Sequence, residues 1–177
     1  LEQMGQNGSY HSVGSGWANA CNTPFRLYKH FCHQGGVLSP CIIHWPAGLK
    51  STRGNLASEP AHLIDLMPTA LAIAGATYPT QHQDGKTFPL PGVNLISLLQ
   101  GKQTERTIFL EHESNRGLRK GRWKLVALKD KPWELYDLER DPTELKNLAA
   151  QRPGTVKRLA NEWRKWASEN QVCLLYT

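Results

Sequence analysis

Lys29 is the residue whose surroundings most suggest chemistry. It lies in the stretch NTPFRLYKHFCHQGGVLSP, residues 22–40, between two aromatic rings and ahead of Gly35 and Gly36. The aromatic rings can partly remove it from water, and two glycines allow close approach of the backbone. An ammonium group in such a loop can neutralise an oxyanion or the charge growing on a leaving oxygen. A lysine in a loop is more often a solvated charge, and the residue types alone leave both interpretations open.

A nucleophile beside this lysine is not evident in the sequence. The signature C-x-P-x-R marks a cysteine that is converted to formylglycine. Cys21 to Arg26 reads C-x-x-P-x-R, which is one residue too long, and Ser58 to His62 has the serine–proline spacing but ends in histidine. Because the modifying enzyme reads this spacing locally, we reject both as that site.

The triplet Glu111-His112-Glu113 offers two carboxylates and one imidazole. On a strand, neighbouring side chains point to opposite faces, so at most Glu111 and Glu113 share a side and His112 is free to reach a pocket on the other. The sequence has no H-x-x-x-H motif, no Asp-rich calcium loop and no C-x-x-C pair. We therefore predict that this triplet is a polar strand end without metal ligands. The alternative is that His112 reaches a pocket.

A basic run follows this triplet. Such a run can bind nucleic acid or a polyanionic sugar, but it is more often the solvent-facing side of a strand. The alternation of Arg122 and Lys124 with Trp123 and Leu125 favours the solvent-facing interpretation. The run consists of Arg116, Arg119, Lys120, Arg122, Lys124, Lys129 and Lys131.

The composition is that of an ordinary globular protein. The 177 residues are 40% hydrophobic and 20% charged, with a net charge of +6, which suits an anionic ligand. No apolar stretch approaches the roughly 20 residues of a membrane span. The first residue is Leu1 and no signal-like segment follows, so we expect a mature form or a fragment. Disulfide pairing among Cys21, Cys32, Cys41 and Cys173 is not assignable from their spacing.

The first part of the chain carries a few α/β elements. Residues 37–45 predict a strand buried on both faces of a parallel sheet. Asp65 is expected to cap a helix that runs to Ala74 and stops at Gly75. Residues 77–92, which contain three prolines and two glycines, predict a long surface loop or linker.

The second part predicts an antiparallel sheet closed by a helix. Asp141 begins a pattern that resembles a capping box with Glu144. Apolar residues including Trp163 and Trp166 recur at helical spacing over 155–170, which predicts a helix that packs on the sheet. The three expected strands are residues 107–113, 122–128 and 133–138.

These elements define an α/β fold class with two domains, residues 1–100 and residues 101–177. One strand and one helix do not bury both faces of a parallel sheet. We therefore expect the chain to be the carboxyl-terminal part of a larger protein.

Six segments in the same order resemble the carboxyl-terminal part of a type I sulfatase of the arylsulfatase family, in the alkaline-phosphatase-like superfamily. They are GWANACNTPFRLYKHFCHQGG, SPCIIHWPAG, HLIDLMPTALAIAGATYP, IFLEHESNRGLRKGRWKLV, PWELYDLERDPTELKNLA and the last, Trp-rich helix, and they span about residues 10–168. The resemblance implies the end of an α/β sandwich catalytic domain over 1–100. It also implies a small antiparallel subdomain packed on a terminal helix over 101–177.

The resemblance implies hydrolysis of aryl or carbohydrate sulfate esters with a formylglycine nucleophile and one calcium ion. Lys29 matches a family lysine that holds a sulfate oxygen and offsets charge on the bridging oxygen, and His112 matches a histidine at the pocket rim in some members. The formylglycine motif and the calcium ligands have no match in this sequence, so we expect the parent protein to supply them and the chain alone to be inactive. The expected partner is a sulfate ester, without nucleic acid or membrane, and the family expectation for the compartment is periplasmic or secreted.

Two other functions stay open. One is a phosphodiesterase or phosphonate hydrolase of the same superfamily, because sulfate and phosphate sites share their geometry. The other is a non-catalytic module that binds polyanions through the basic run. The sequence does not name the natural ester or the oligomeric state.

Overall fold

The computed structural model divides the chain into two compact units, which are described separately. The first unit combines Leu1–Pro40 with Arg106–Thr177, and the second is Cys41–Glu105. Residues up to 40 thus share a unit with the carboxyl-terminal sheet. The predicted boundary at residue 100 concerns the domains of a larger protein and stays a prediction. The structure describes residues 6–8, 12–49, 54, 56–83, 85–100 and 106–172.

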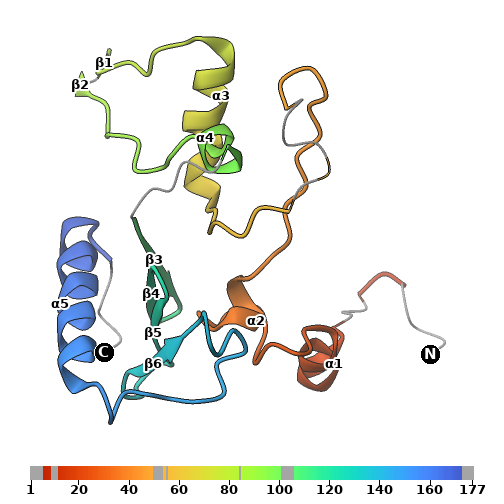
Figure 1. The fold of residues 1–177 in the computed structure, drawn as a ribbon, viewed down its shortest axis with the longest axis vertical. Helices are drawn as coiled ribbons and strands as arrows, with labels where there is room; N and C mark the ends of the chain where they lie inside the picture. The colour runs from red at the N-terminus through yellow and green to blue at the C-terminus, as the bar shows by residue number, and fades with distance from the viewer. Residues whose placement is uncertain are drawn as a thin grey trace. The chain divides into compact units, whose positions relative to one another are not determined.

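The centre of the first unit is a four-stranded antiparallel sheet in the order β3-β4-β5-β6 (Figure 1). Each strand pairs with the next along the chain, so the sheet is a meander. The predicted strands at 107–113, 122–128 and 133–138 are confirmed as β3, β5 and β6. The bounds are β3 Thr107–His112, β4 Asn115–Lys120, β5 Trp123–Ala127 and β6 Glu134–Asp137.

Strand β4 has no counterpart in the sequence prediction. Its residues NRGLRK are mostly polar, and the turn before it is Glu113-Ser114, which lacks the Asn-Gly or Asp-Gly pair typical of a two-residue hairpin. Both turn residues nevertheless have positive φ angles, 50° and 68°. The turn joins β3 to β4 in the register His112 opposite Asn115. The turn geometry is therefore present without its usual sequence signal.

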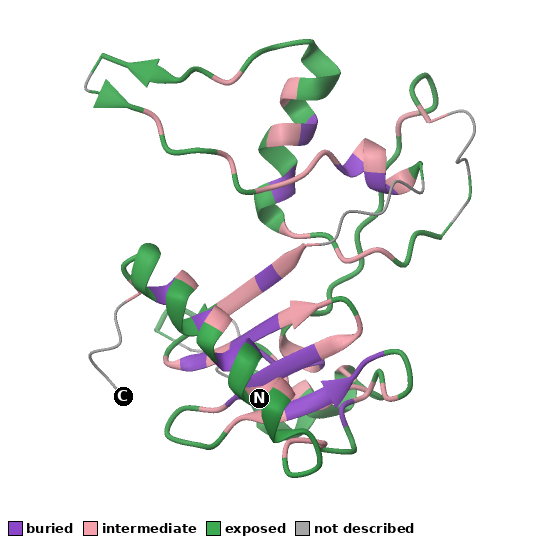
Figure 2. Cartoon of the chain, turned by 60° about the vertical axis from the view of Figure 1, so that its left-hand side comes forward, coloured by how far each residue is buried: buried purple, intermediate pink, exposed green. Residues whose placement is uncertain are grey.

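Helix α5, Pro153–Glu169, packs on this sheet as predicted (Figure 2). Leu159, Trp163 and Ala167 on its inner side are buried against Leu118 and Leu125 of the sheet. The helix begins with proline in its first turn, where a missing N–H costs little.

The expected capping box at Asp141 is not a helix cap. The Asp141 carboxylate accepts hydrogen bonds from the Leu145 and Lys146 N–H groups at 3.0 and 2.8 Å, but a turn follows where the helix was expected. Glu144 has a positive φ of 58° and its buried side chain points to another part of the unit. The capping pattern therefore stabilises a loop.

Two short helices precede the sheet in the first unit, α1 Gly14–Cys21 and α2 Gln34–Val37. The predicted strand over 37–45 is wrong: Val37 ends α2, and residues 38–45 have no regular structure. A strand exists only when at least one neighbouring strand forms backbone hydrogen bonds with it. No described residue pairs with this stretch, and Ile42 is 93% exposed.

The described residues of the second unit form a 3-10 helix, two α-helices and a small hairpin. The predicted end of the long helix is confirmed, since Gly75 follows α3 with a left-handed φ of 62°. Asp65 is the N-cap residue of α3, as predicted, but its side chain makes no capping hydrogen bond to that helix. Its carboxylate instead accepts from the His62 and Val93 N–H groups at 2.7 and 2.9 Å. It therefore joins two loop segments. The elements are η1 Leu63–Asp65, α3 Leu66–Ala74, α4 Leu95–Leu99 and the small hairpin β1 Gln81–His82 with β2 Gly85–Lys86.

Among the described residues, the helices are all too short or too polar to cross a membrane.

Candidate functional site

The two residues that the sequence singled out, Lys29 and His112, line the same cavity. The cavity has a volume of about 240 Å³ and is formed by residues 29–32, 36–37 and 110–112. It therefore joins the loop before α2 to the end of β3, two segments of the first unit that are far apart in the sequence. Lys29 is exposed, and Tyr28 and Phe31 contact each other edge to face at 5.2 Å. The ammonium group of Lys29 is therefore accessible to an anionic ligand.

Gly35 and Gly36 allow the tight fold of the loop that carries Lys29, as predicted. A Cβ atom on Gly36 would lie 2.0 Å from the carbonyl oxygen of Phe31, and one on Gly35 would lie 2.2 Å from that of Arg26. No side chain fits at such distances, because the obstacles are backbone atoms. Asn22 adds a further restraint by donating to the Leu27 and Gly35 carbonyls, both at 2.9 Å.

A buried ion pair holds the start of α2 against the sheet. Glu144 accepts from the Gln34 N–H at 2.8 Å, and its other oxygen lies 3.9 Å from Lys124 Nζ. Lys124 Nζ also donates to Gln34 Oε1 at 3.3 Å. The interpretation of Lys124 as solvent-facing is wrong: the residue is 1% exposed, and burial lowers its pKa to about 8. The alternation of side chains along the strand predicted the wrong exposure for Lys124, because the face of the sheet that it occupies is covered too.

A second polar group surrounds His33, which is completely buried. Its Nε2 lies 3.4 Å from Glu134 Oε2, and Tyr136 donates to the same carboxylate. Arg26 donates to the Tyr136 hydroxyl at 2.9 Å and to the Glu144 carbonyl at 2.8 Å. The hydrogen bond from His33 holds the pKa of Glu134 below its ordinary value. Residues 26–34 are thus fixed to β6 and to the loop after it.

Asn115 connects the loop to the β3–β4 hairpin. Its Nδ2 donates to the His30 carbonyl at 3.1 Å, its Oδ1 accepts from the Lys129 N–H, and its carbonyl accepts from the Cys32 thiol at 3.3 Å. Burial raises the pKa of Cys32 to about 11. Cys32 therefore stays a neutral thiol near pH 7 and is not a nucleophile.

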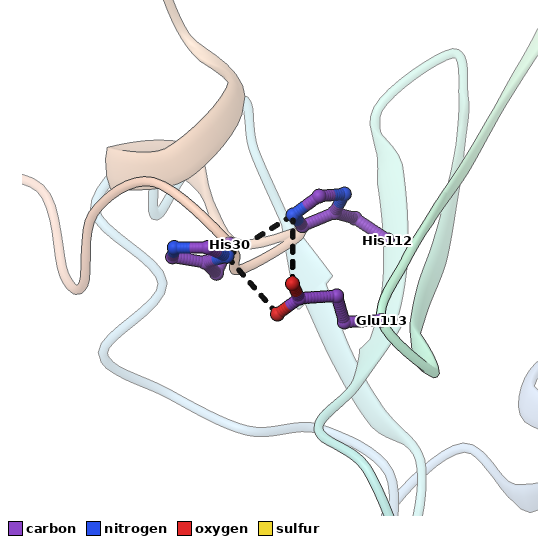
Figure 3. A group of neighbouring side chains, drawn as sticks. All are labelled: His30, His112 and Glu113. Carbon is purple, nitrogen blue, oxygen red and sulfur yellow. Dashed lines mark hydrogen bonds and ion pairs between the residues drawn. The ribbon is translucent and has the colours of Figure 1, made fainter. Parts of the chain in front are cut away.

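Three side chains converge at the edge of the cavity: His30, His112 and Glu113 (Figure 3). His30 Nδ1 lies 3.1 Å from His112 Nε2 and 3.0 Å from Glu113 Oε2, and His112 Nε2 lies 3.9 Å from Glu113 Oε1. His112 was predicted as a pocket residue, whereas no role was predicted for His30 or Glu113. Glu113 does not follow the alternation of side chains expected for a strand, because it lies in the turn after β3, where the strand has ended.

This cluster does not fit calcium. Calcium takes six to eight oxygen ligands, whereas the cluster supplies two imidazole nitrogens and a single carboxylate. Among the described residues it is the only group of three or more His, Cys, Asp or Glu side chains with ligand atoms close enough to share an ion. This cluster is therefore not the calcium site that the family resemblance implies.

Comparison with known proteins identifies the family to which this chain belongs. The family described as "N-sulphoglucosamine sulphohydrolase, C-terminal" matches residues 25–168. An uncharacterized sulfatase of Schizosaccharomyces pombe is 32% identical over 97% of this chain and 32% of its own length. An N-acetylgalactosamine-6-O-sulfatase of Bacteroides thetaiotaomicron is 28% identical over 78% of this chain and 30% of its own length.

The chain belongs to the sulfatase family, and it corresponds to the carboxyl-terminal domain of these enzymes. It spans about a third of the length of these curated relatives. The crystal structure of Ps i-CgsB superposes with a TM-score of 0.64 at 21% identity, over 82% of this chain and 32% of that one. This similarity confirms the predicted fold class, a mixed α/β fold with an antiparallel sheet and a terminal helix.

Proposed function

We propose that this chain is the carboxyl-terminal part of an enzyme that hydrolyses sulfate esters, and that the cavity lined by Lys29 and His112 receives the sulfate group. The observation that carries the proposal is the convergence of these two residues from segments 83 positions apart, 112 − 29, on one cavity. Membership of the sulfatase family supports the reaction class.

In this proposal Lys29 acts on the charge of the substrate. Its ammonium group binds a sulfate oxygen and offsets the negative charge that grows on the bridging oxygen as the S–O bond breaks. His112 lies at the end of β3 and contacts the ester at the rim of the cavity. Formylglycine and calcium, which would supply the nucleophile and bind the sulfate, come from other parts of the parent protein.

The loop architecture gives this role a physical basis. Lys29 is accessible, but the backbone on both sides of it is held by Gly35, Gly36 and the buried Glu144. A charged group on a fixed backbone needs little reorganisation when the substrate binds, which is what electrostatic stabilisation of a transition state requires.

The proposed substrate is an aryl or carbohydrate sulfate. The relatives' names point to different esters: one is an N-acetylgalactosamine-6-O-sulfatase and another, from Rhizobium meliloti, is a choline-sulfatase. We favour a sugar or aryl sulfate because the cavity is open and bordered by the aromatic ring of Phe31, which suits a ring-shaped alcohol.

The test is a kinetic comparison in the full-length parent protein. With p-nitrophenyl sulfate as substrate, Lys29→Ala is expected to lower kcat/KM by about 100-fold or more, the scale seen when one transition-state stabilising group is removed. Lys165→Ala, on the exposed side of α5, is the matched control and should leave kcat/KM unchanged. Wild-type kinetics with Lys29→Ala would remove Lys29 from the proposal, and p-nitrophenyl phosphate cleaved faster than the sulfate would favour the phosphoesterase alternative.

The polyanion-binding alternative is weakened by the pairing of the basic run. Lys120 donates to Glu162 at 2.8 Å, Arg122 is bound to Asp137, and Lys124 is buried. These three positive charges are balanced within the unit, so they offer less to a bound polyanion than the sequence suggests. Retention of the chain on heparin at moderate salt, lost on neutralising Arg119, Lys120 and Arg122, would revive this alternative.

A further inference from the structure

We propose that His30, His112 and Glu113 form a binding site for a divalent transition-metal ion of the Zn²⁺ type, at the edge of the cavity. This site is separate from the calcium that the sulfatase resemblance implies. It shares His112 with the cavity of the proposed function, so its test measures metal binding and not sulfatase activity.

The spacing of the three donor groups matches a tetrahedral metal site. Zinc–nitrogen and zinc–oxygen bonds of about 2.0–2.2 Å in a tetrahedron place neighbouring donor atoms about 3.3–3.6 Å apart. In this cluster the two imidazole nitrogens lie 3.1 Å apart, His30 Nδ1 lies 3.0 Å from Glu113 Oε2, and His112 Nε2 lies 3.9 Å from Glu113 Oε1. The two carboxylate distances involve different oxygens, and one ligand atom from each residue can be chosen so that all three lie within 4.8 Å of one another. An ion placed among these atoms would need only small shifts of the side chains.

The nitrogen atoms face one another in a way that suits an ion. His30 Nδ1 and His112 Nε2 are 3.1 Å apart, and the rings are inclined at 30° (Figure 3). Each of the two carboxylate oxygens of Glu113 approaches one of these nitrogens. Without an ion, the two facing nitrogens can share only one proton if both imidazoles are neutral. A divalent ion satisfies the lone pairs of both imidazoles and the negative charge of the carboxylate together.

The backbone holds these residues in place before any ion binds. The His30 carbonyl accepts from Asn115 Nδ2 at 3.1 Å, and Asn115 is paired with His112 across the hairpin. Glu113 is held by a turn in which both residues have positive φ. Because one residue, Asn115, joins both halves of the site, little conformational freedom is lost on binding.

The donor set selects the kind of ion. Two imidazoles and one carboxylate, with the fourth position open to water, are typical of Zn²⁺ and of related ions such as Co²⁺ and Ni²⁺. The side chains of His30, His112 and Glu113 are 46%, 51% and 64% exposed, so an ion from solution has direct access. Hard ions such as Ca²⁺ and Mg²⁺ prefer oxygen ligands and are not expected to bind here.

The experiment is a titration of the 177-residue chain with Co²⁺, followed by visible absorption, and with Zn²⁺, followed by calorimetry. A background in which Cys21, Cys41 and Cys173 are changed to serine removes thiols that would compete for the ion. We expect one ion per chain and a d–d spectrum of the intensity typical of four-coordinate cobalt. Ca²⁺ should give no heat in the same range.

The variants decide whether the ion sits at this cluster. His30→Ala and His112→Ala are each expected to weaken binding at least 10-fold, and Glu113→Gln to weaken it as well. His44→Ala, an exposed histidine outside the cluster, is the control and should bind like the wild type. Circular dichroism checks that each variant is folded. The proposal is overturned if the wild-type background binds neither ion, or if binding survives unchanged in the folded His30→Ala/His112→Ala double variant.

Discussion

Two histidines three residues apart in the same loop have opposite surroundings. His33 is completely buried and contacts Glu134, and its neighbour Gln34 is bound to the buried pair of Lys124 and Glu144. His30 is exposed at the cavity, where it meets a second histidine and an exposed carboxylate.

The buried side of the loop stabilises the fold, whereas the exposed side carries the groups that can bind a ligand. The buried His33 is paired with the Glu134 carboxylate through Nε2, which fixes this side of the loop to β6. An exposed histidine does not stabilise the core by burial, and its ring nitrogens are accessible to a substrate or an ion. The loop is fixed on one side so that the other side presents Lys29 and His30 in a defined position.

The largest expected effect is on the buried side. Glu144→Gln keeps the shape of the side chain but leaves Lys124 as a buried charge without its counter-ion. Breaking such a pair is expected to lower the free energy of unfolding by about 3 kcal/mol or more. Urea denaturation of the 177-residue chain measures this loss of unfolding free energy. The control is Glu169→Gln, which removes one partner of an exposed ion pair on α5. This control is expected to lower the free energy of unfolding by about 0.5 kcal/mol or less. Equal losses for both variants would show that the buried pair does not hold the loop.

The glycine pair gives the next prediction. Gly36→Ala places a Cβ atom 2.0 Å from a backbone carbonyl, so the loop has to move, at a cost of about 1–3 kcal/mol. Gly154→Ala is the matched control, because its Cβ would meet no atom within 4 Å and alanine favours the helix that contains it. The two substitutions should therefore change the urea midpoint in opposite directions. A Gly36→Ala variant as stable as the wild type would mean that the loop is not tightly packed.

A smaller effect should depend on pH. The folded state holds the pKa of Glu134 below its ordinary value of 4.5, so the unfolded chain binds more protons in acid. The stability from this carboxylate is fully present above pH 4.5 and is lost as the pH falls through the lower, folded pKa. Glu134→Gln is thus expected to cost about 1.5 kcal/mol at pH 7. In urea denaturation, the difference in unfolding free energy between this variant and the wild type should shrink below pH 4.5. A difference that does not depend on pH would contradict the lowered pKa of Glu134.

Much of the first unit could be predicted from the sequence. The strands β3, β5 and β6 and the Trp-rich helix α5 carry their own apolar patterns, which depend on local spacing. Strand β4 was missed because it is polar and follows an unusual turn. The buried Lys124 was misplaced because its partner Glu144 lies 20 positions away, 144 − 124, and alternation within one strand does not reveal such a contact.

The candidate site was predictable only in part. Lys29 and His112 could be named from the sequence, but the sequence did not show that both line one cavity. His30 carries no local signal, because its partners come from the hairpin at 112–113. The failed strand over 37–45 has a similar cause: its apolar residues require neighbouring strands that no described residue supplies.

The central claim is that the exposed side of this loop binds the sulfate group, and a crystal structure of the full-length parent protein with inorganic sulfate tests it most directly. We predict a sulfate ion in the cavity with an oxygen within hydrogen-bonding distance of Lys29 Nζ, and the loop held by the hydrogen bond from the Gln34 N–H to Glu144. A sulfate ion bound elsewhere in the active site, with Lys29 directed to solvent, would contradict the claim.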